Sequence, residues 1–131
     1  MTMSPSTSHT PVPLLRFENF QVAFARGPAV RGLDLSVHRG EALGIVGESG
    51  SGKSITWLAA LGLLGSAARI SGRVLFEGQD LLGMTPKALA RLRGGRIALI
   101  SQDPMSALNP VKRVGHQVAE VLRLHRGMQD A

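Results

Sequence analysis

Alternation of apolar and polar side chains dominates the first third of the chain. Residues 14–24 (LLRFENFQVAF) are rich in apolar and aromatic side chains with partial alternation, which predicts one or two strands. Residues 33–37 alternate regularly and predict a half-buried strand. Glycine and proline interrupt these segments, so we expect turns at 27–28 and 39–41. The pattern therefore predicts that the chain opens with β structure.

Two short runs carry apolar residues without alternation. Residues 42–46 (ALGIV) and 97–100 (IALI) are typical of strands that are covered on both faces. Residues 74–76 (VLF) predict a further strand, and Gly72 is expected to begin the turn before it.

Three segments are predicted to be helical. A helix is expected over 54–64, after a Gly/Ser-rich loop. Thr85 is suited to cap a helix over 86–93, whose first residue is a proline. The last helix, over 114–126, carries one apolar stripe and can be closed by Gly127. Its stripe consists of Val114, Val118, Val121, Leu122 and His125. Strands first, followed by strand–loop–helix units, predict an α/β (mixed α+β) fold.

Composition narrows the class of protein. The chain has 131 residues, of which 44% are hydrophobic and 18% charged, as in a folded globular chain. We expect a Ser/Thr/Pro-rich disordered tail over 1–13 and one domain over 14–131. The absence of cysteine excludes disulfides, thiolate metal sites and a cysteine nucleophile. The most apolar stretch, 55–65, is too short to span a bilayer, and the start of the chain does not resemble a signal peptide.

The chain is basic, with a formal net charge of +6, and the excess lies mainly in its second half. Such a bias is compatible with nucleic acid, anionic lipid or a nucleotide, and equally with an ordinary solvated surface. A nucleic-acid-binding function would use Arg91, Arg93, Arg96 and Arg113. Aromatic residues are only 4% of the chain, so platforms for base stacking are scarce, and no nucleic acid partner is expected.

The clearest chemical motif is residues 47–54 (GESGSGKS), which fit the phosphate-binding pattern G-x4-G-K-[ST]. We interpret Gly47, Gly50 and Gly52 as positions where the backbone adopts angles that a Cβ would forbid. The loop can then turn its N–H groups toward a phosphate, at the positive end of the following helix. A Gly/Ser-rich turn with an unrelated lysine is the structural alternative.

Two side chains of this loop have separate expected roles. Lys53 places a compact cation on the β- and γ-phosphates, and Ser54 offers a hydroxyl to Mg²⁺. The predicted cofactors are ATP and Mg²⁺. The predicted nucleotide-binding residues of this region are Gly47, Glu48, Ser49, Gly50, Ser51, Gly52, Lys53, Ser54 and Ile55.

Together with this loop, residues 70–81 (ISGRVLFEGQDL) and 96–110 (RIALISQDPMSALNP) resemble the ATP-binding subunit of an ABC transporter. The run QDPMSALNP is particularly similar to the oligopeptide/dipeptide/nickel importer branch. The resemblance extends over about residues 14–127. It implies a P-loop NTPase nucleotide-binding domain with an N-terminal antiparallel β part.

The resemblance also assigns roles outside the loop. Gln102 matches the family's glutamine, which reaches Mg²⁺ and the attacking water; a solvated glutamine at a strand end is the alternative. Phe24 matches the aromatic residue that stacks on adenine, although a core phenylalanine is an equal alternative. Residues 103–110 resemble the surface that meets a coupling helix of the transmembrane permease subunits.

The resemblance implies an ATP-hydrolysing subunit at the cytoplasmic face of the inner membrane, energising uptake of peptides or similar small solutes. Its expected partners are permease subunits and a second ATP-binding subunit in a head-to-tail dimer. The sequence contains no LSGGQ-like signature, no strand ending in the catalytic aspartate and glutamate, and no switch histidine. We therefore expect the N-terminal portion of such a subunit, inactive by itself. A truncated, non-catalytic nucleotide-binding module is the alternative, and a P-loop small-molecule kinase is less well supported.

Overall fold

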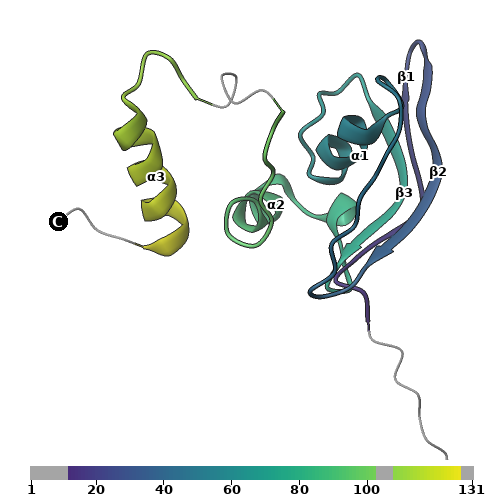
Figure 1. Cartoon of the computed structure of the whole chain (residues 1–131), viewed down its shortest axis with the longest axis horizontal. Helices are drawn as coiled ribbons and strands as arrows, with labels where there is room; N and C mark the ends of the chain where they lie inside the picture. Colours follow the sequence, from purple (N-terminus) through teal and green to yellow (C-terminus); the bar gives the residue numbers. More distant parts are fainter. Residues whose placement is uncertain (1–11, 103–107, 128–131) are drawn as a thin grey trace, which may run out of the picture. The chain divides into compact units, whose positions relative to one another are not determined.

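A computed structural model describes residues 12–102 and 108–127, which form two compact units, Met1–Met84 and Thr85–Ala131 (Figure 1). The first unit contains strands β1 (Leu15–Phe24), β2 (Gly27–Val37), β3 (Arg69–Phe76) and β4 (Gln79–Asp80), helix α1 (Lys53–Ala60) and the 3₁₀ turn η1 (Leu81–Gly83). The second unit contains helices α2 (Pro86–Leu92) and α3 (Val114–Arg126). The predicted tail over 1–13 lies almost entirely outside the described residues.

The first unit is built on one antiparallel sheet with the strand order β2-β1-β3-β4. The predicted β structure at 14–24 and 33–37 is confirmed by β1 and by the second half of β2. The turn between them lies at Ala25–Arg26, not at 27–28, because Gly27 already pairs with Phe24. The two long strands therefore form a tight hairpin.

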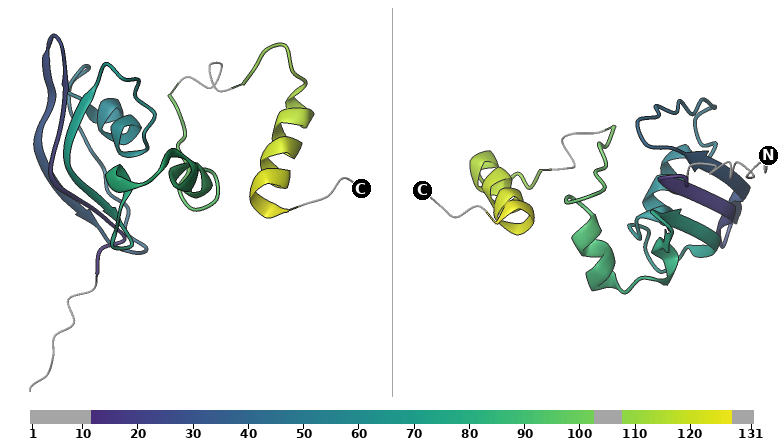
Figure 2. Two further views of the ribbon diagram at one scale, coloured as in Figure 1. Left: turned by 180° about the vertical axis from the view of Figure 1, so that it is seen from behind. Right: turned by 90° about the horizontal axis from the view of Figure 1, so that it is seen from below.

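Helix α1 packs on the concave face of this sheet, as Figures 1 and 2 show. The buried core includes Phe17, Phe20, Val22 and Val74 from the strands. The ring of Phe17 meets Phe20 edge-on at a centroid distance of 5.2 Å and Trp57 of α1 at 5.6 Å. Phe17 thus joins the sheet to the helix that follows the glycine-rich loop.

Gly72 lies inside β3 and does not begin a turn, contrary to the sequence prediction. Its φ is +88°, and an ideal Cβ on it would lie 2.4 Å from the carbonyl oxygen of Asn19. Asn19 has a φ of +43° and sits at a register irregularity of β1. Glycine is therefore required here by a bulge, where two backbones approach closely.

The two predicted strands at 42–46 and 97–100 are absent from the described residues. Residues 42–46 are irregular and exposed, and only Ile97 of the second run makes an isolated bridge, to Arg93. A strand covered on both faces needs partners at its edges and layers above and below it. Among the described residues, neither run has these partners, which is why local hydrophobicity alone was misleading.

The observed helices agree better with the sequence predictions than these two strands do. Helix α1 begins one residue before the prediction and stops at Ala60, and Gly62 then adopts a φ of +62°. Thr85 caps α2 by accepting a hydrogen bond from the Ala88 N–H at 3.3 Å. Helix α3 has the predicted bounds and ends at Gly127 in a left-handed conformation. Within the described ranges, none of the helices has the length and apolar character needed to cross a membrane.

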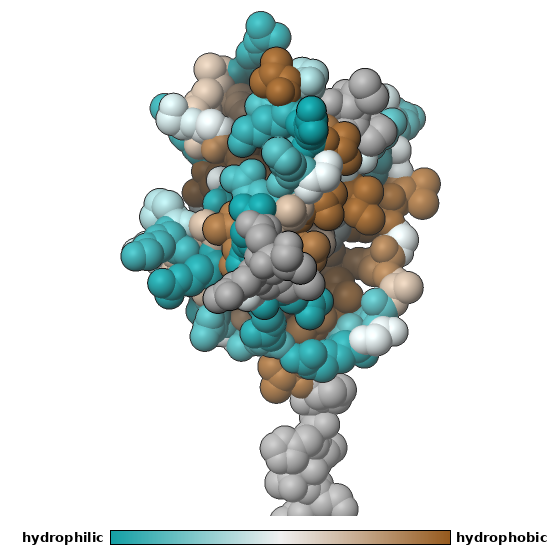
Figure 3. All heavy atoms as spheres, turned by 90° about the vertical axis from the view of Figure 1, so that its left-hand side faces the viewer, coloured by the Kyte–Doolittle hydropathy of each residue, from teal (hydrophilic) through white to brown (hydrophobic). Residues whose placement is uncertain are grey.

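Apolar side chains reach the surface beside polar ones on the face of the molecule shown in Figure 3. Val46 and Ile100, from the two runs without strand partners, are 99% and 94% exposed.

Candidate functional site

The glycine-rich loop ends against strand β2. Gly52 caps α1 with a φ of +91°, and an ideal Cβ on it would lie 2.5 Å from the Ala29 carbonyl oxygen. No larger residue fits this contact without movement of the backbone. The start of α1 is thereby held beside β2.

Glycine is needed at the other two positions, Gly50 and Gly47, for different structural reasons. Gly50 has a φ of +80° and open space around it, so its backbone angle requires glycine. Gly47 is not among the glycines with positive φ, which corrects the sequence interpretation of that position. An ideal Cβ there would lie 2.8 Å from the Ser51 Oγ and 3.6 Å from the Lys53 Nζ. At Gly47 the absence of a side chain leaves room for these two groups.

Lys53 folds across the loop. Its Nζ donates to the carbonyl oxygens of Gly47 at 2.6 Å and Glu48 at 2.7 Å, and to the Ser51 Oγ at 3.0 Å. The carbonyl oxygen of Glu48 also accepts from the Ser51 N–H at 3.2 Å. The first two carbonyl groups of the loop therefore face the lysine, whereas the sequence predicted that main-chain amides would line the loop.

The amides farther along the loop remain available. In the described parts of the chain, the N–H groups of Gly50, Gly52 and Lys53 pair with no acceptor. No side chain caps the N-terminus of α1, and its first turn holds no acidic residue. Unpaired amides and the helix dipole make this end attractive to an anion.

Helix α1 places Ser54 one residue after Lys53, with its side chain exposed. No described residue bonds its hydroxyl, so an oxygen ligand for a hard cation is free there. Thr56, on the buried face, donates from its Oγ1 to the Gly52 carbonyl oxygen at 3.0 Å. The helix thus anchors one hydroxyl internally and presents the other.

A pocket of about 260 Å³ adjoins this loop. It is lined by Val30, Leu33, Ile45, Val46, Gly47, Ser51, Gly52, Lys53 and Thr56. Sequence reasoning did not select the four apolar residues. Leu33, Ile45 and Val46 lie in runs that predicted strands, and Val30 lies in no predicted element. Their presence beside a cation creates a pocket with one apolar wall and one polar wall.

Of the predicted site residues, only Gly47, Ser51, Gly52 and Lys53 line this pocket; Phe24, Glu48, Ser49, Gly50, Ser54, Ile55 and Gln102 do not. Phe24 is half-buried at the end of β1, opposite Gly27. Gln102 is exposed and belongs to the second unit, which is described separately from the loop. Asp103, at the start of the predicted permease surface, lies outside the described residues. Glu48 and Ser49 are exposed, and Ile55 is half-buried on α1.

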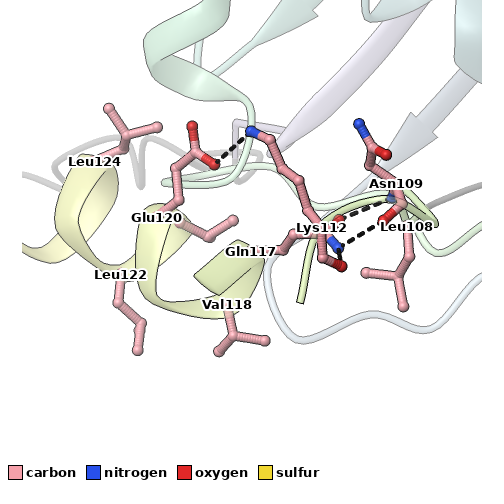
Figure 4. A pocket seen from close by; sticks show the side chains of 9 residues that line it. Leu108, Asn109, Lys112, Gln117, Val118, Glu120, Leu122 and Leu124 are labelled. Carbon is pink, nitrogen blue, oxygen red and sulfur yellow. Dashed lines mark hydrogen bonds and ion pairs between the residues drawn. The ribbon is translucent and has the colours of Figure 1, made fainter. Parts of the chain in front are cut away.

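The second unit carries its own groove, of about 470 Å³, shown in Figure 4. It is lined by Leu108, Asn109, Lys112, Gln117, Val118, Glu120, Val121, Leu122 and Leu124. Gln117 fastens the preceding loop to α3, because its side chain bonds the Asn109 N–H and carbonyl oxygen at 2.9 and 3.0 Å. Lys112 and Glu120 form an ion pair at 3.7 Å. The groove therefore lies between an apolar face of α3 and the preceding residues Leu108, Asn109 and Lys112.

The chain is similar to known proteins over most of its length. A model of the ABC transporter family matches residues 30–130. The chain is 44% identical over 138 aligned positions to the oligopeptide transport ATP-binding protein of Salmonella typhimurium, with 100% of this chain and 41% of the relative covered. Oligopeptide transport ATP-binding proteins from Escherichia coli (OppD) and Bacillus subtilis (AppD) are 46% and 40% identical, and the alignments cover 90% and 88% of this chain. The chain spans 36% and 37% of the length of those two relatives.

Proposed function

The chain belongs to the ABC transporter family, and from this premise we propose that it binds MgATP at residues 47–55. The observation that carries the proposal is the loop itself. Lys53 closes across it, unpaired amides follow, and an uncapped helix begins at its end. A phosphate group is the ligand that this combination of cation and amides recognises best.

The residues of the loop are proposed to bind different parts of MgATP. The Lys53 ammonium and the main-chain amides of Gly50, Gly52 and Lys53 hold the phosphates, and Ser54 supplies an oxygen to Mg²⁺. When bound, Mg²⁺ neutralises phosphate charge. Gln102 is proposed as a further group toward the metal and the attacking water, and Phe24 as the surface on which adenine stacks. The half-exposed ring of Phe24 supports that assignment.

The whole protein is proposed to be the ATP-hydrolysing subunit of an importer for peptides or similar small solutes. The names of the relatives, which are oligopeptide transport ATP-binding proteins, support this substrate class. The 131 residues contain neither the signature motif nor the catalytic aspartate–glutamate pair. Phosphoryl transfer depends on positioning and electrostatics, so we propose that this chain by itself binds nucleotide without turnover.

The proposed partners are transmembrane permease subunits and a second ATP-binding subunit arranged head to tail. The permease would meet residues 103–110 and the adjoining groove of α3. The apolar lining contributed by Leu108, Val118 and Val121 suits a helix of a partner. We therefore propose a peripheral location at the cytoplasmic face of the inner membrane.

The binding proposal is tested by urea unfolding with and without MgATP. At about 100 times its dissociation constant, MgATP should raise the free energy of unfolding by about 2.7 kcal/mol. Lys53→Ala should lose most of this gain, whereas Lys87→Ala, at an exposed position of α2, should keep it. A wild-type protein that MgATP does not stabilise would exclude nucleotide binding.

Turnover is tested separately by phosphate release from the isolated chain. We expect none above the level of Lys53→Ala. Lysine-dependent release would show that the chain hydrolyses ATP without the missing motifs. It would overturn the proposed inactivity but leave the binding site intact.

A further inference from the structure

The ammonium group of Lys53 is fully occupied within the loop. It has three N–H donors, and they meet the carbonyl oxygens of Gly47 and Glu48 and the Ser51 Oγ. A phosphate oxygen that binds Lys53 must therefore take the place of one of these acceptors.

The three acceptors differ in how readily they can be displaced. The two carbonyl groups belong to the main chain, and the Glu48 oxygen also accepts from the Ser51 N–H. Releasing them would require the main chain of the loop to move. The Ser51 hydroxyl ends a rotatable side chain on an exposed residue, and its contact with Lys53, at 3.0 Å, is the longest of the three. The hydrogen bond between Lys53 and the Ser51 hydroxyl is therefore the one that a ligand can displace at the lowest cost in free energy.

The position of Gly47 is a second, independent observation that concerns the Ser51 hydroxyl. Its φ does not require glycine, yet a Cβ there would come within 2.8 Å of the Ser51 Oγ. The loop is thus shaped to leave room for the Ser51 hydroxyl beside the Lys53 ammonium. A side chain at position 47 would therefore collide with the Ser51 hydroxyl that bonds Lys53.

We propose that Ser51 is a positioning residue whose hydroxyl occupies the phosphate-oxygen position on Lys53 and is exchanged for that oxygen when nucleotide binds. This inference rests on the proposed nucleotide binding. A charged phosphate oxygen is the stronger acceptor, so the exchange is favourable. The displaced hydroxyl nevertheless opposes binding, while it keeps the lysine directed across the loop.

The first measurement needs no nucleotide. Trace acetylation of Lys53 by acetic anhydride, read by peptide mass spectrometry, reports how freely its amine reacts. Ser51→Ala removes one of three hydrogen bonds and should accelerate acetylation about three- to tenfold. Ser51→Thr retains a hydroxyl and should react like the wild type, as should Ser36→Ala on the exposed side of β2. Equal rates in the wild type and Ser51→Ala overturn the proposal.

The second measurement is calorimetric titration with MgATP and with magnesium pyrophosphate. Ser51→Ala should bind both about threefold more tightly than the wild type, because no hydroxyl has to be displaced. Ser51→Thr should match the wild type. Weaker binding by Ser51→Ala would make the hydroxyl a direct phosphate ligand and overturn the exchange.

The two measurements distinguish a failure of the proposed Ser51 exchange from a failure of the proposed nucleotide binding. A wild-type chain that binds neither ligand overturns the proposed nucleotide binding, and the exchange with it, whatever the acetylation rates are. A wild-type chain that binds MgATP, with Ser51→Ala equal to it in both measurements, overturns the role of Ser51 alone.

Discussion

Gly52 packs directly against the backbone of Ala29, so closely that an ideal Cβ on Gly52 would lie 2.5 Å from the Ala29 carbonyl oxygen. This contact joins the end of the glycine-rich loop to β2. It places the positive end of α1 beside the hairpin, where the apolar residue Val30 also lines the pocket. The geometry of the glycine-rich loop therefore depends on a strand residue that lies more than 20 residues earlier in the chain.

Gly52→Ala should destabilise the first unit and abolish stabilisation by MgATP. The left-handed angle costs about 1–2 kcal/mol for a residue with a Cβ, and the clash with Ala29 adds to it. Urea unfolding should therefore show a loss of about 2 kcal/mol or more. Gly44→Ala, where a Cβ meets nothing within 4 Å, should stay within about 0.5 kcal/mol of the wild type. Equal stability of the two variants would contradict the contact.

Gly72→Ala tests the bulge opposite Asn19. It combines a φ of +88° with a Cβ that would lie 2.4 Å from the Asn19 oxygen. Gly78 has a similar φ of +80° but open space, so Gly78→Ala measures the cost of the angle alone. We expect Gly78→Ala to lose about 1 kcal/mol and Gly72→Ala clearly more, by chemical denaturation. A smaller loss at Gly72 would argue against the close approach.

Phe17→Ala should remove the link between the sheet and α1. Truncation of a buried phenylalanine costs about 3–5 kcal/mol. Trp57 is the only tryptophan of the chain and touches this ring, so its fluorescence reports the change directly. Phe17→Leu should retain more stability and still shift the emission to the red. Unchanged emission in both variants would contradict the packing, and Val12→Ala, at a site that is 77% exposed, is the control.

Thr85→Ala should weaken the start of α2 by about 1 kcal/mol, because the Ala88 N–H loses its capping oxygen. Hydrogen exchange measured by NMR should be faster at Ala88. Thr85→Ser keeps the oxygen and should protect that amide as the wild type does. Exchange at Ala88 that is unaffected by removal of the hydroxyl would exclude the cap.

Val46→Ser should leave the free energy of unfolding within about 0.5 kcal/mol, because the Val46 side chain is 99% exposed. Val22→Ser, at a fully buried position of β1, should cost several times more. Thermal melts of the two variants measure this difference. A large loss at Val46 would mean that residues 42–46 form the buried strand that their composition predicts.

Interactions between residues close together in the sequence determined much of the secondary structure of this protein. The alternation in residues 14–24, the Thr85-Pro86 start of α2, and the stripe of α3 ending at Gly127 depend on neighbouring residues, and the sequence predicted them correctly. The motif at 47–54 likewise identified the phosphate-loop pattern from its spacing alone. These features could be predicted because capping, periodicity and glycine spacing act within one or two turns of chain.

Only the tertiary structure decided what depends on distant partners. Residues 42–46 and 97–100 look like buried strands, but a strand exists only where other strands and covering layers meet it. The contact of Gly52 with Ala29, the bulge of Gly72 against Asn19, and the room that Gly47 leaves for Ser51 and Lys53 cannot be recognised from spacing. Each depends on where a backbone far along the chain, or a side chain folded back across a loop, comes to lie in space.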